Sequence, residues 1–127
     1  MFSLGERHRY FLYRQATDMR KGFDSLSGAV RNDLGLDPLS GDVFIFMNSR
    51  RTYIKLLVWE ASGFVLYYKR LERGRFEYPL GEQTGSSLAV SWPQLMLIIQ
   101  GIDLKSVRQR KRFSLPEKTS KIDEKTG

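Results

Sequence analysis

The sequence predicts a single α+β domain in which a mostly antiparallel sheet, a three-stranded meander with flanking strands, carries two helices. Three apolar runs, at residues 43–47, 53–59 and 64–71, follow one another with connections of a few residues. Connections this short join antiparallel neighbours, which predicts the meander. Helical patterns flank these runs at residues 19–34 and 92–100. With 127 residues, the chain is long enough for one compact domain and short for two.

One flanking strand and one helix are predicted ahead of the meander. Residues 9–14 (RYFLYR) are rich in aromatic side chains and bounded by charge, which is typical of a strand. The next stretch predicts an amphipathic helix, with Thr17 or Asp18 as its N-cap and Gly35 at its end. Its apolar stripe recurs at helical spacing and consists of Met19, Phe23, Leu26, Val30 and Leu34.

A second helix is predicted after a short strand at residues 88–90. Ser91 and Gln94 have the spacing of a capping box, in which side chains and backbone satisfy each other's hydrogen bonds. We therefore expect a helix at residues 92–100 that ends at Gly101.

Apolar residues cover more than one side of this second helix, because Leu97 and Ile98 extend its main stripe. A helix that is apolar on most sides is either buried or docked against a partner. Leu97 and Ile98 are therefore candidates for contact with a partner protein, and burial in the core is the alternative.

Positive charge is concentrated in two segments of the chain, whose formal net charge is +7. Residues 48–75 hold seven basic and two acidic residues, whereas residues 76–104 hold three acidic residues and no lysine or arginine. Residues 105–127 hold eight basic and three acidic residues with few apolar ones, which predicts a largely disordered basic tail after a domain at residues 1–104. The excess charge favours an acidic partner, nucleic acid rather than a membrane.

The meander predicts where the central basic residues lie. The loop at residues 48–52, the start of the second strand and the end of the third strand share one end of a meander. Basic side chains beside aromatic rings suit phosphates and unstacked bases. The alternative is a merely solvated sheet end. The predicted nucleic-acid-binding residues are Arg50, Arg51, Lys55, Lys69, Arg70, Arg73 and Arg75, with Tyr53, Tyr67, Tyr68 and Phe76 among them.

Residues for catalysis or metal binding are not recognisable in the sequence. There is no cysteine, and the single histidine, His8, can complete neither a catalytic triad nor an ordinary zinc site. The aspartates lie in predicted caps, turns and helix surfaces. We therefore expect no catalytic residue, metal or cofactor, and no enzymatic activity. No apolar run is long enough to cross a bilayer, so we expect a cytoplasmic protein without a membrane partner.

Four blocks of sequence, in order, resemble a known family. They are residues 17–26 (TDMRKGFDSL), 41–46 (GDVFIF), 55–59 (KLLVW) and 67–76 (YYKRLERGRF). The chain resembles, over residues 7–104, the TnpB accessory protein, an Orf2-like protein of insertion-sequence-66-type bacterial transposable elements. The matching residues to which the resemblance assigns no role include Asp18, Arg20, Lys21 and Trp59.

The resemblance implies a role in DNA transposition beside a larger transposase that supplies the catalytic acids. We therefore expect a non-catalytic accessory factor that binds DNA at the element ends, or the transposase–DNA complex, through the basic end of the sheet. The alternative is a protein–protein adaptor for the cognate transposase that does not contact DNA. The sequence leaves the oligomeric state open.

Overall fold

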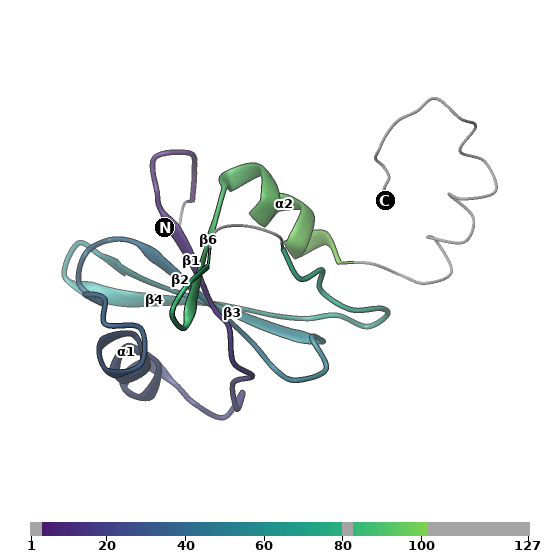
Figure 1. Ribbon diagram of the computed structural model, residues 1–127, viewed down its shortest axis with the longest axis horizontal. Coiled ribbons are helices and arrows are strands. Elements are labelled where there is room, and N and C mark those ends of the chain that lie inside the picture. Colours follow the sequence, from purple (N-terminus) through teal and green to yellow (C-terminus); the bar gives the residue numbers. More distant parts are fainter. Residues whose placement is uncertain (1–3, 80–82, 102–127) are drawn as a thin grey trace.

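The computed structural model describes residues 4–79 and 83–101. These residues form a six-stranded sheet in the order β4-β3-β2-β1-β6-β5, with one helix on each face (Figure 1). Among the described strands, β1 pairs with β2 in parallel and all other pairs are antiparallel. The predicted α+β class is therefore confirmed. The elements are β1 (Tyr10–Tyr13), α1 (Phe23–Asn32), β2 (Val43–Met47), β3 (Tyr53–Glu60), β4 (Gly63–Arg70), β5 (Gln83–Thr84), β6 (Ser87–Val90) and α2 (Trp92–Gln100).

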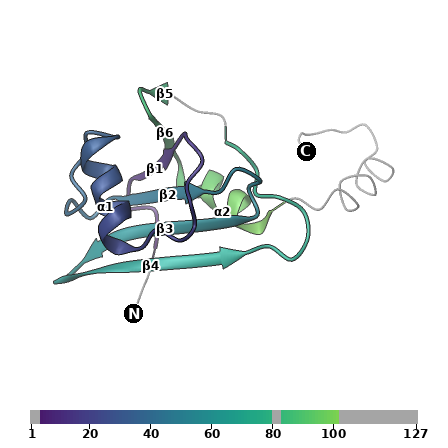
Figure 2. The same ribbon diagram turned by 90° about the horizontal axis from the view of Figure 1, so that it is seen from below.

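The predicted meander is confirmed as β2, β3 and β4, which run side by side in Figure 2. Tyr53 at the start of β3 pairs with Arg70 at the end of β4. Glu60 pairs with Gly63 at the other end, so a tight turn joins these two strands. The predicted strand at residues 9–14 is β1, which lies beside β2 because α1 provides the crossover that a parallel pair requires.

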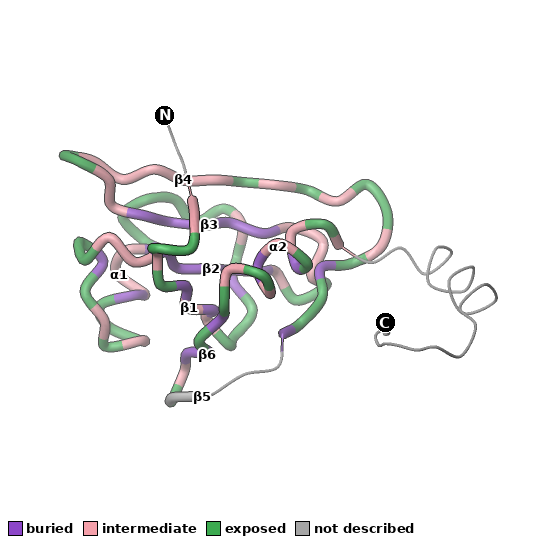
Figure 3. The backbone as a smooth tube through the Cα atoms, turned by 90° about the horizontal axis from the view of Figure 1, so that it is seen from above, coloured by how far each residue is buried: buried purple, intermediate pink, exposed green. Residues whose placement is uncertain are grey.

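Two apolar cores lie on opposite faces of the sheet. On one face, Leu95 and Ile98 of α2 pack over the β2, β3 and β1 side chains. On the other face, Leu26 and Val30 of α1 pack over Phe44 and neighbouring side chains. Every residue of β2 is buried because both of its faces are covered, whereas β4 at the edge is largely half-buried (Figure 3).

The start of α1 differs from the prediction. The helix begins at Phe23 with Gly22 as its N-cap, and neither Thr17 nor Asp18 caps it. Instead, the Thr17 N–H donates to the Met47 carbonyl oxygen at 2.8 Å, which ties this segment to the end of β2. The stripe residue Met19 therefore lies outside the helix, although it packs against the α1 core. The end of the helix is close to the prediction, because Gly35 has a positive φ of 65° just beyond it.

The predicted second helix is confirmed at both ends. The Gln94 N–H donates to Ser91 Oγ at 3.2 Å, and the Ser91 N–H donates to Gln94 Oε1 at 2.8 Å, so the capping box is complete. Gly101 is the C-cap of α2. The predicted tail at residues 105–127 lies outside the described residues.

The turn between β3 and β4 gives a stability prediction. Ala61 has a φ of 56°, a left-handed conformation that favours glycine. We expect Ala61→Gly to raise the free energy of unfolding by about 0.5–1 kcal/mol, since the relieved strain exceeds the added entropy of the unfolded chain. Ser62 is not among the residues with positive φ, so Ser62→Gly is the matched control and should destabilise the protein. Thermal unfolding of both variants tests this, and equal shifts would contradict it.

Candidate nucleic-acid interface

Two loops meet at the end of the sheet where β3 begins and β4 ends. The Leu71 N–H donates to the Thr52 carbonyl oxygen at 2.9 Å, and the Phe76 N–H donates to the Arg51 carbonyl oxygen at 2.7 Å. These two bonds hold residues 72–75 against residues 48–52. The arginines of both loops therefore lie at one end of the sheet, as the meander predicted. We call this surface the basic end and define it as Arg50, Arg51, Arg70, Arg73 and Arg75.

Most arginines of the basic end are available to a ligand. Arg50, Arg73 and Arg75 are exposed, and none of them forms an ion pair within the described part of the chain. Arg70 pairs with Glu72 at 2.8 Å, and the hydrogen bonds to Glu72 and then to Tyr53 raise the pKa of Arg70. Guanidinium groups that are free of internal partners can bind phosphate oxygens in a bidentate manner.

Lys55 does not belong to this surface, which corrects the predicted set. The residue is only 5% exposed. Its Nζ donates to the carbonyl oxygens of Met19 at 2.8 Å and Lys21 at 2.7 Å, and it lies 4.5 Å from the Tyr68 ring centroid. Burial lowers the pKa of Lys55. The ammonium group thus fastens residues 19–21 to the sheet and is not presented to DNA.

Lys69 has an internal partner as well. It is half-buried on the α2 face, where its Nζ donates to the Ile99 carbonyl oxygen at 2.9 Å. Ile99 lies in the last turn of α2, where unpaired carbonyls and the helix dipole favour a positive charge. Lys69 therefore stabilises the packing of α2 on the sheet. Like Lys55, it does not belong to the exposed surface that was predicted to contact phosphates.

The two partner-binding candidates on α2 have different environments. Ile98 is 2% exposed and belongs to the core, so its predicted contact with a partner is wrong and the alternative of burial holds. Leu97 is 59% exposed and remains on the surface. Their adjacent positions on the helix direct one side chain to the sheet and the other to solvent.

Residues 17–22, which begin the family block at residues 17–26, lie beside the basic end, and no sequence pattern predicted this position. The hydrogen bond from Lys55 Nζ to the Met19 carbonyl oxygen holds this segment against the sheet. The hydrogen bond from the Thr17 N–H to the Met47 carbonyl oxygen holds its start. Arg20 and Lys21 are exposed there. The signal available in the sequence was the charge itself, since two basic residues would be unfavourable in the first turn of a helix. Trp59 lies elsewhere, half-buried near the far end of β3, with its ring 5.0 Å from that of Phe64.

Asp18 is held in its charged form by its neighbour. The Arg20 side chain donates to both carboxylate oxygens, with the shortest distance 2.7 Å, and the Arg20 N–H donates to Oδ1 at 2.9 Å. The hydrogen bonds from the Arg20 side chain and backbone lower the pKa of Asp18 from 3.8 to about 2. The carboxylate therefore stays negative at any physiological pH.

This shift predicts a pH dependence of stability. Because the pKa of Asp18 is depressed in the folded state, its contribution is fully present above pH 3.8 and is lost as pH falls toward 2. We expect wild type to lose thermal stability more steeply than Asp18→Asn between these pH values. A carboxyl NMR titration checks the same group directly, and an ordinary midpoint near 3.8 would contradict the prediction.

The aromatic residues at the basic end divide into two groups. Tyr53 and Tyr68 lie together, with ring centroids 5.8 Å apart, and Tyr68 is 51% exposed. Phe76 is buried and Tyr67 packs against the α2 core, so neither is the exposed ring that the sequence predicted. Two tyrosines thus remain for contact with a ligand.

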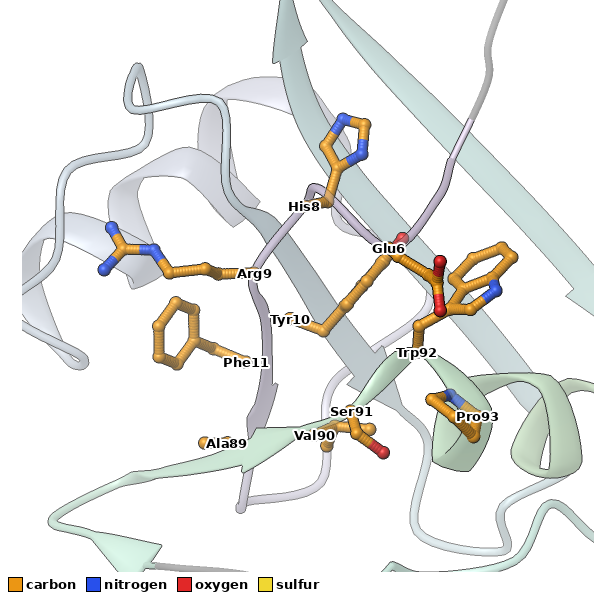
Figure 4. Close-up of a pocket in the computed structure, with 10 residues that line it drawn as sticks. All are labelled: Glu6, His8, Arg9, Tyr10, Phe11, Ala89, Val90, Ser91, Trp92 and Pro93. Carbon is orange, nitrogen blue, oxygen red and sulfur yellow. The ribbon is translucent and has the colours of Figure 1, made fainter.

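Two open depressions in the described surface lie at opposite ends of the sheet. One of about 410 Å³ lies at the basic end, between residues 16–19 and the start of β3. The other, of about 490 Å³, lies between β1 and the start of α2, where the stacked rings of Tyr10 and Trp92 and the Glu6 side chain line it (Figure 4).

Among the described residues, no group of histidine and acidic side chains could hold a metal ion. No described helix is long and apolar enough to cross a membrane.

Comparison with known proteins gives one family and two curated relatives. A family model described as IS66 Orf2 like protein matches residues 8–109. The chain is 38% identical over 103 residues to the uncharacterized protein y4hO of Sinorhizobium fredii (strain NBRC 101917 / NGR234), covering 81% of this chain and 88% of that protein. It is 31% identical over 112 residues to the uncharacterized protein y4jC of the same strain, covering 88% and 93%. No solved structure matches the chain.

Proposed function

Because the chain belongs to the IS66 Orf2-like family of transposition-associated accessory proteins, we propose that it is a non-catalytic factor that binds DNA through its basic end. The single observation that carries this proposal is the set of exposed arginines on two loops that backbone hydrogen bonds join. Arg50, Arg73 and Arg75 have no acidic partner among the described residues, so their charge is available for phosphates.

The rigidity of the basic end supports binding of an extended polyanion. The Asn48 side chain accepts hydrogen bonds from the N–H groups of Thr52 and Tyr53, both at 2.9 Å, which fixes the loop that carries Arg50. Loops that are already ordered lose little conformational entropy on binding. Phosphate contacts position a protein on DNA but carry no sequence information, so we propose binding with little sequence preference.

An adaptor role is the second candidate, and α2 favours it. The helix holds no charged residue, and Leu97 projects 59% exposed from it. Exposed apolar side chains without neighbouring charge suit a protein surface such as that of the transposase. In this second candidate function, the chain contacts the transposase through α2 and does not contact DNA directly.

The experiment that tests the proposal measures binding of the purified full chain to duplex DNA over a range of salt concentrations, with and without the transposase. If four arginines of the basic end reach phosphates, log affinity should fall with log salt at a slope of roughly −4. Duplex binding that is absent without the transposase, but restored with it in a manner that Leu97→Glu abolishes, would favour the adaptor.

A further inference from the structure

β4 forms one edge of the sheet and is long enough to pair with a strand of another chain. It has eight residues, and its register with β3 runs without a bulge from the Tyr53–Arg70 pair to the Glu60–Gly63 pair. Figure 2 shows β3 on one side of β4 and no further described strand on the other. The opposite edge is β5, which has only two residues. A long edge strand without a bulge is a template for pairing.

The outward-facing backbone groups of β4 follow from its bonds to β3. The Leu71 N–H donates to the Thr52 carbonyl oxygen at 2.9 Å, and this pair continues the register of the two strands. Hydrogen-bonded pairs alternate along an antiparallel ladder, so the odd-numbered residues of β4 bond to β3. The N–H and carbonyl groups of the even-numbered residues therefore point away from the sheet. These residues are Phe64, Leu66, Tyr68 and Arg70, and no backbone bond from another described segment reaches them.

β4 lacks the features that usually protect an edge strand, which are charged side chains, proline and bulges. Residues 63–68 hold neither charge nor proline. The ammonium group of Lys69 is bonded to the Ile99 carbonyl oxygen of α2, so it does not guard the edge. The apolar side chains of residues 64–66 are half-buried on both faces of the sheet, and Tyr68 is 51% exposed. A neighbouring strand would therefore cover apolar surface as well as backbone groups.

The sequence of β4 is complementary to a second copy of itself. In an antiparallel pair, opposite residues share one face of the sheet. A twofold axis at Tyr67 places Leu66 opposite Tyr68 of the second copy, and Phe64 opposite Arg70 of the second copy. Aliphatic–aromatic and cation–π pairs of this kind stabilise adjacent strands, and no cation faces another cation. With the axis at any other residue, at least one outward-facing residue would have no partner in the second β4.

We propose that two copies of this chain associate through β4 into a symmetric dimer with one continuous sheet. The same surface of both copies forms such an interface, which is the commonest arrangement in homodimers. The inference goes beyond the proposed function, because the pairing requires no DNA. The two β4 strands run in opposite directions, so the basic ends of the two copies lie on opposite sides of the twofold axis. The dimer would thus present two separate basic ends.

The first test is the oligomeric state of the full chain without DNA, measured by sedimentation equilibrium. We expect a dimer that Tyr68→Pro weakens and Tyr68→Thr retains. Proline removes the outward-facing N–H of residue 68 but spares the bonds to β3, whereas the threonine control loses the same ring and keeps the N–H. Symmetry removes two hydrogen bonds, so the dissociation constant of Tyr68→Pro should exceed that of Tyr68→Thr by roughly 30-fold.

Disulfide crosslinking tests the register, and it decides the question even if Tyr68→Pro does not fold. The chain has no cysteine, so introduced cysteines react only with each other. Leu66→Cys and Tyr68→Cys, mixed and oxidised, should form a mixed disulfide faster than either variant forms one with itself. Opposite Cα atoms lie about 5.5 Å apart and diagonal ones about 7–8 Å, and disulfides require the shorter distance. Leu39→Cys, exposed before β2, is the control and should crosslink slowly.

The outcomes separate the dimer from the proposed function. A full chain that remains monomeric, or equal dissociation constants for the two Tyr68 variants, would overturn the dimer. A mixed disulfide that forms no faster than the Leu39→Cys disulfide would overturn pairing at β4. Each of these results would leave salt-dependent DNA binding unaffected. Absence of DNA binding by a chain that dimerises would overturn the proposed function alone.

Discussion

Replacing Arg50 and Arg73 together by alanine is expected to weaken binding of the full chain to duplex DNA by roughly 50-fold at about 0.1 M salt. The two residues lie on the loops that meet at the basic end, and neither forms an ion pair with a described residue. Each phosphate contact contributes about 0.9 to the salt slope, so the slope should become shallower by about two. The loss should be similar for all DNA sequences.

The control for this double variant removes the same charge elsewhere. Arg7 precedes β1 at the opposite end of the sheet, and Arg31 lies in the last turn of α1. Both are exposed, and neither belongs to the basic end. Arg7→Ala combined with Arg31→Ala should leave the salt slope nearly unchanged. Equal losses in the two double variants would indicate that net charge alone, and not the basic end, determines the affinity.

Replacing Lys55 by methionine is expected to lower the free energy of unfolding by about 2–3 kcal/mol, although the new side chain is apolar and similar in length. The variant loses two charge-assisted hydrogen bonds to the carbonyl oxygens of Met19 and Lys21. Burial of the Lys55 ammonium group carries a desolvation cost, and removal of this cost in the variant offsets part of the loss. Residues 19–21 should detach from the sheet, which hydrogen exchange at these amides can detect.

Lys69→Met is the matched control for Lys55→Met. Lys69 donates to one carbonyl oxygen and is half-buried, so its replacement should cost less than that of Lys55. Chemical denaturation of the two variants gives the comparison. If Lys55→Met were as stable as wild type, Lys55 would not be the anchor of residues 19–21.

Much of the fold could be predicted because local patterns and global structure agree. The meander followed from three apolar runs with short connections, and α2 followed from a capping box and a terminal glycine. The start of α1 could not be predicted in this way. Thr17 and Asp18 are good N-cap residues in isolation. In the structure, however, the Thr17 N–H donates to the Met47 carbonyl oxygen, and the Asp18 carboxylate pairs with Arg20. Both bonds depend on the path of the chain before the helix.

The location of the candidate site could be predicted from the sequence, but which basic residues are exposed there could not. The sequence order of the meander brings the loops at residues 48–52 and 72–75 together whatever the side chains are. Whether a basic residue reaches solvent depends on what covers its face of the sheet. Residues 19–21 cover Lys55, and the end of α2 covers Lys69. The sequence of the strands alone does not indicate that either lysine is covered by another segment. The exposure of the arginines on the loops could be predicted, because loops lie at the surface.

NMR mapping of the full chain with duplex DNA is the measurement that tests the role of the basic end most directly. Amide shifts are observed residue by residue, so the basic end, α2 and the residues after Gly101 are distinguished in one titration. We expect the largest shifts at Arg50, Arg51 and Arg73 and in the adjoining residues 19–21, with little change in α2. Shifts confined to α2 or to residues after Gly101 would contradict the assignment of DNA binding to the basic end.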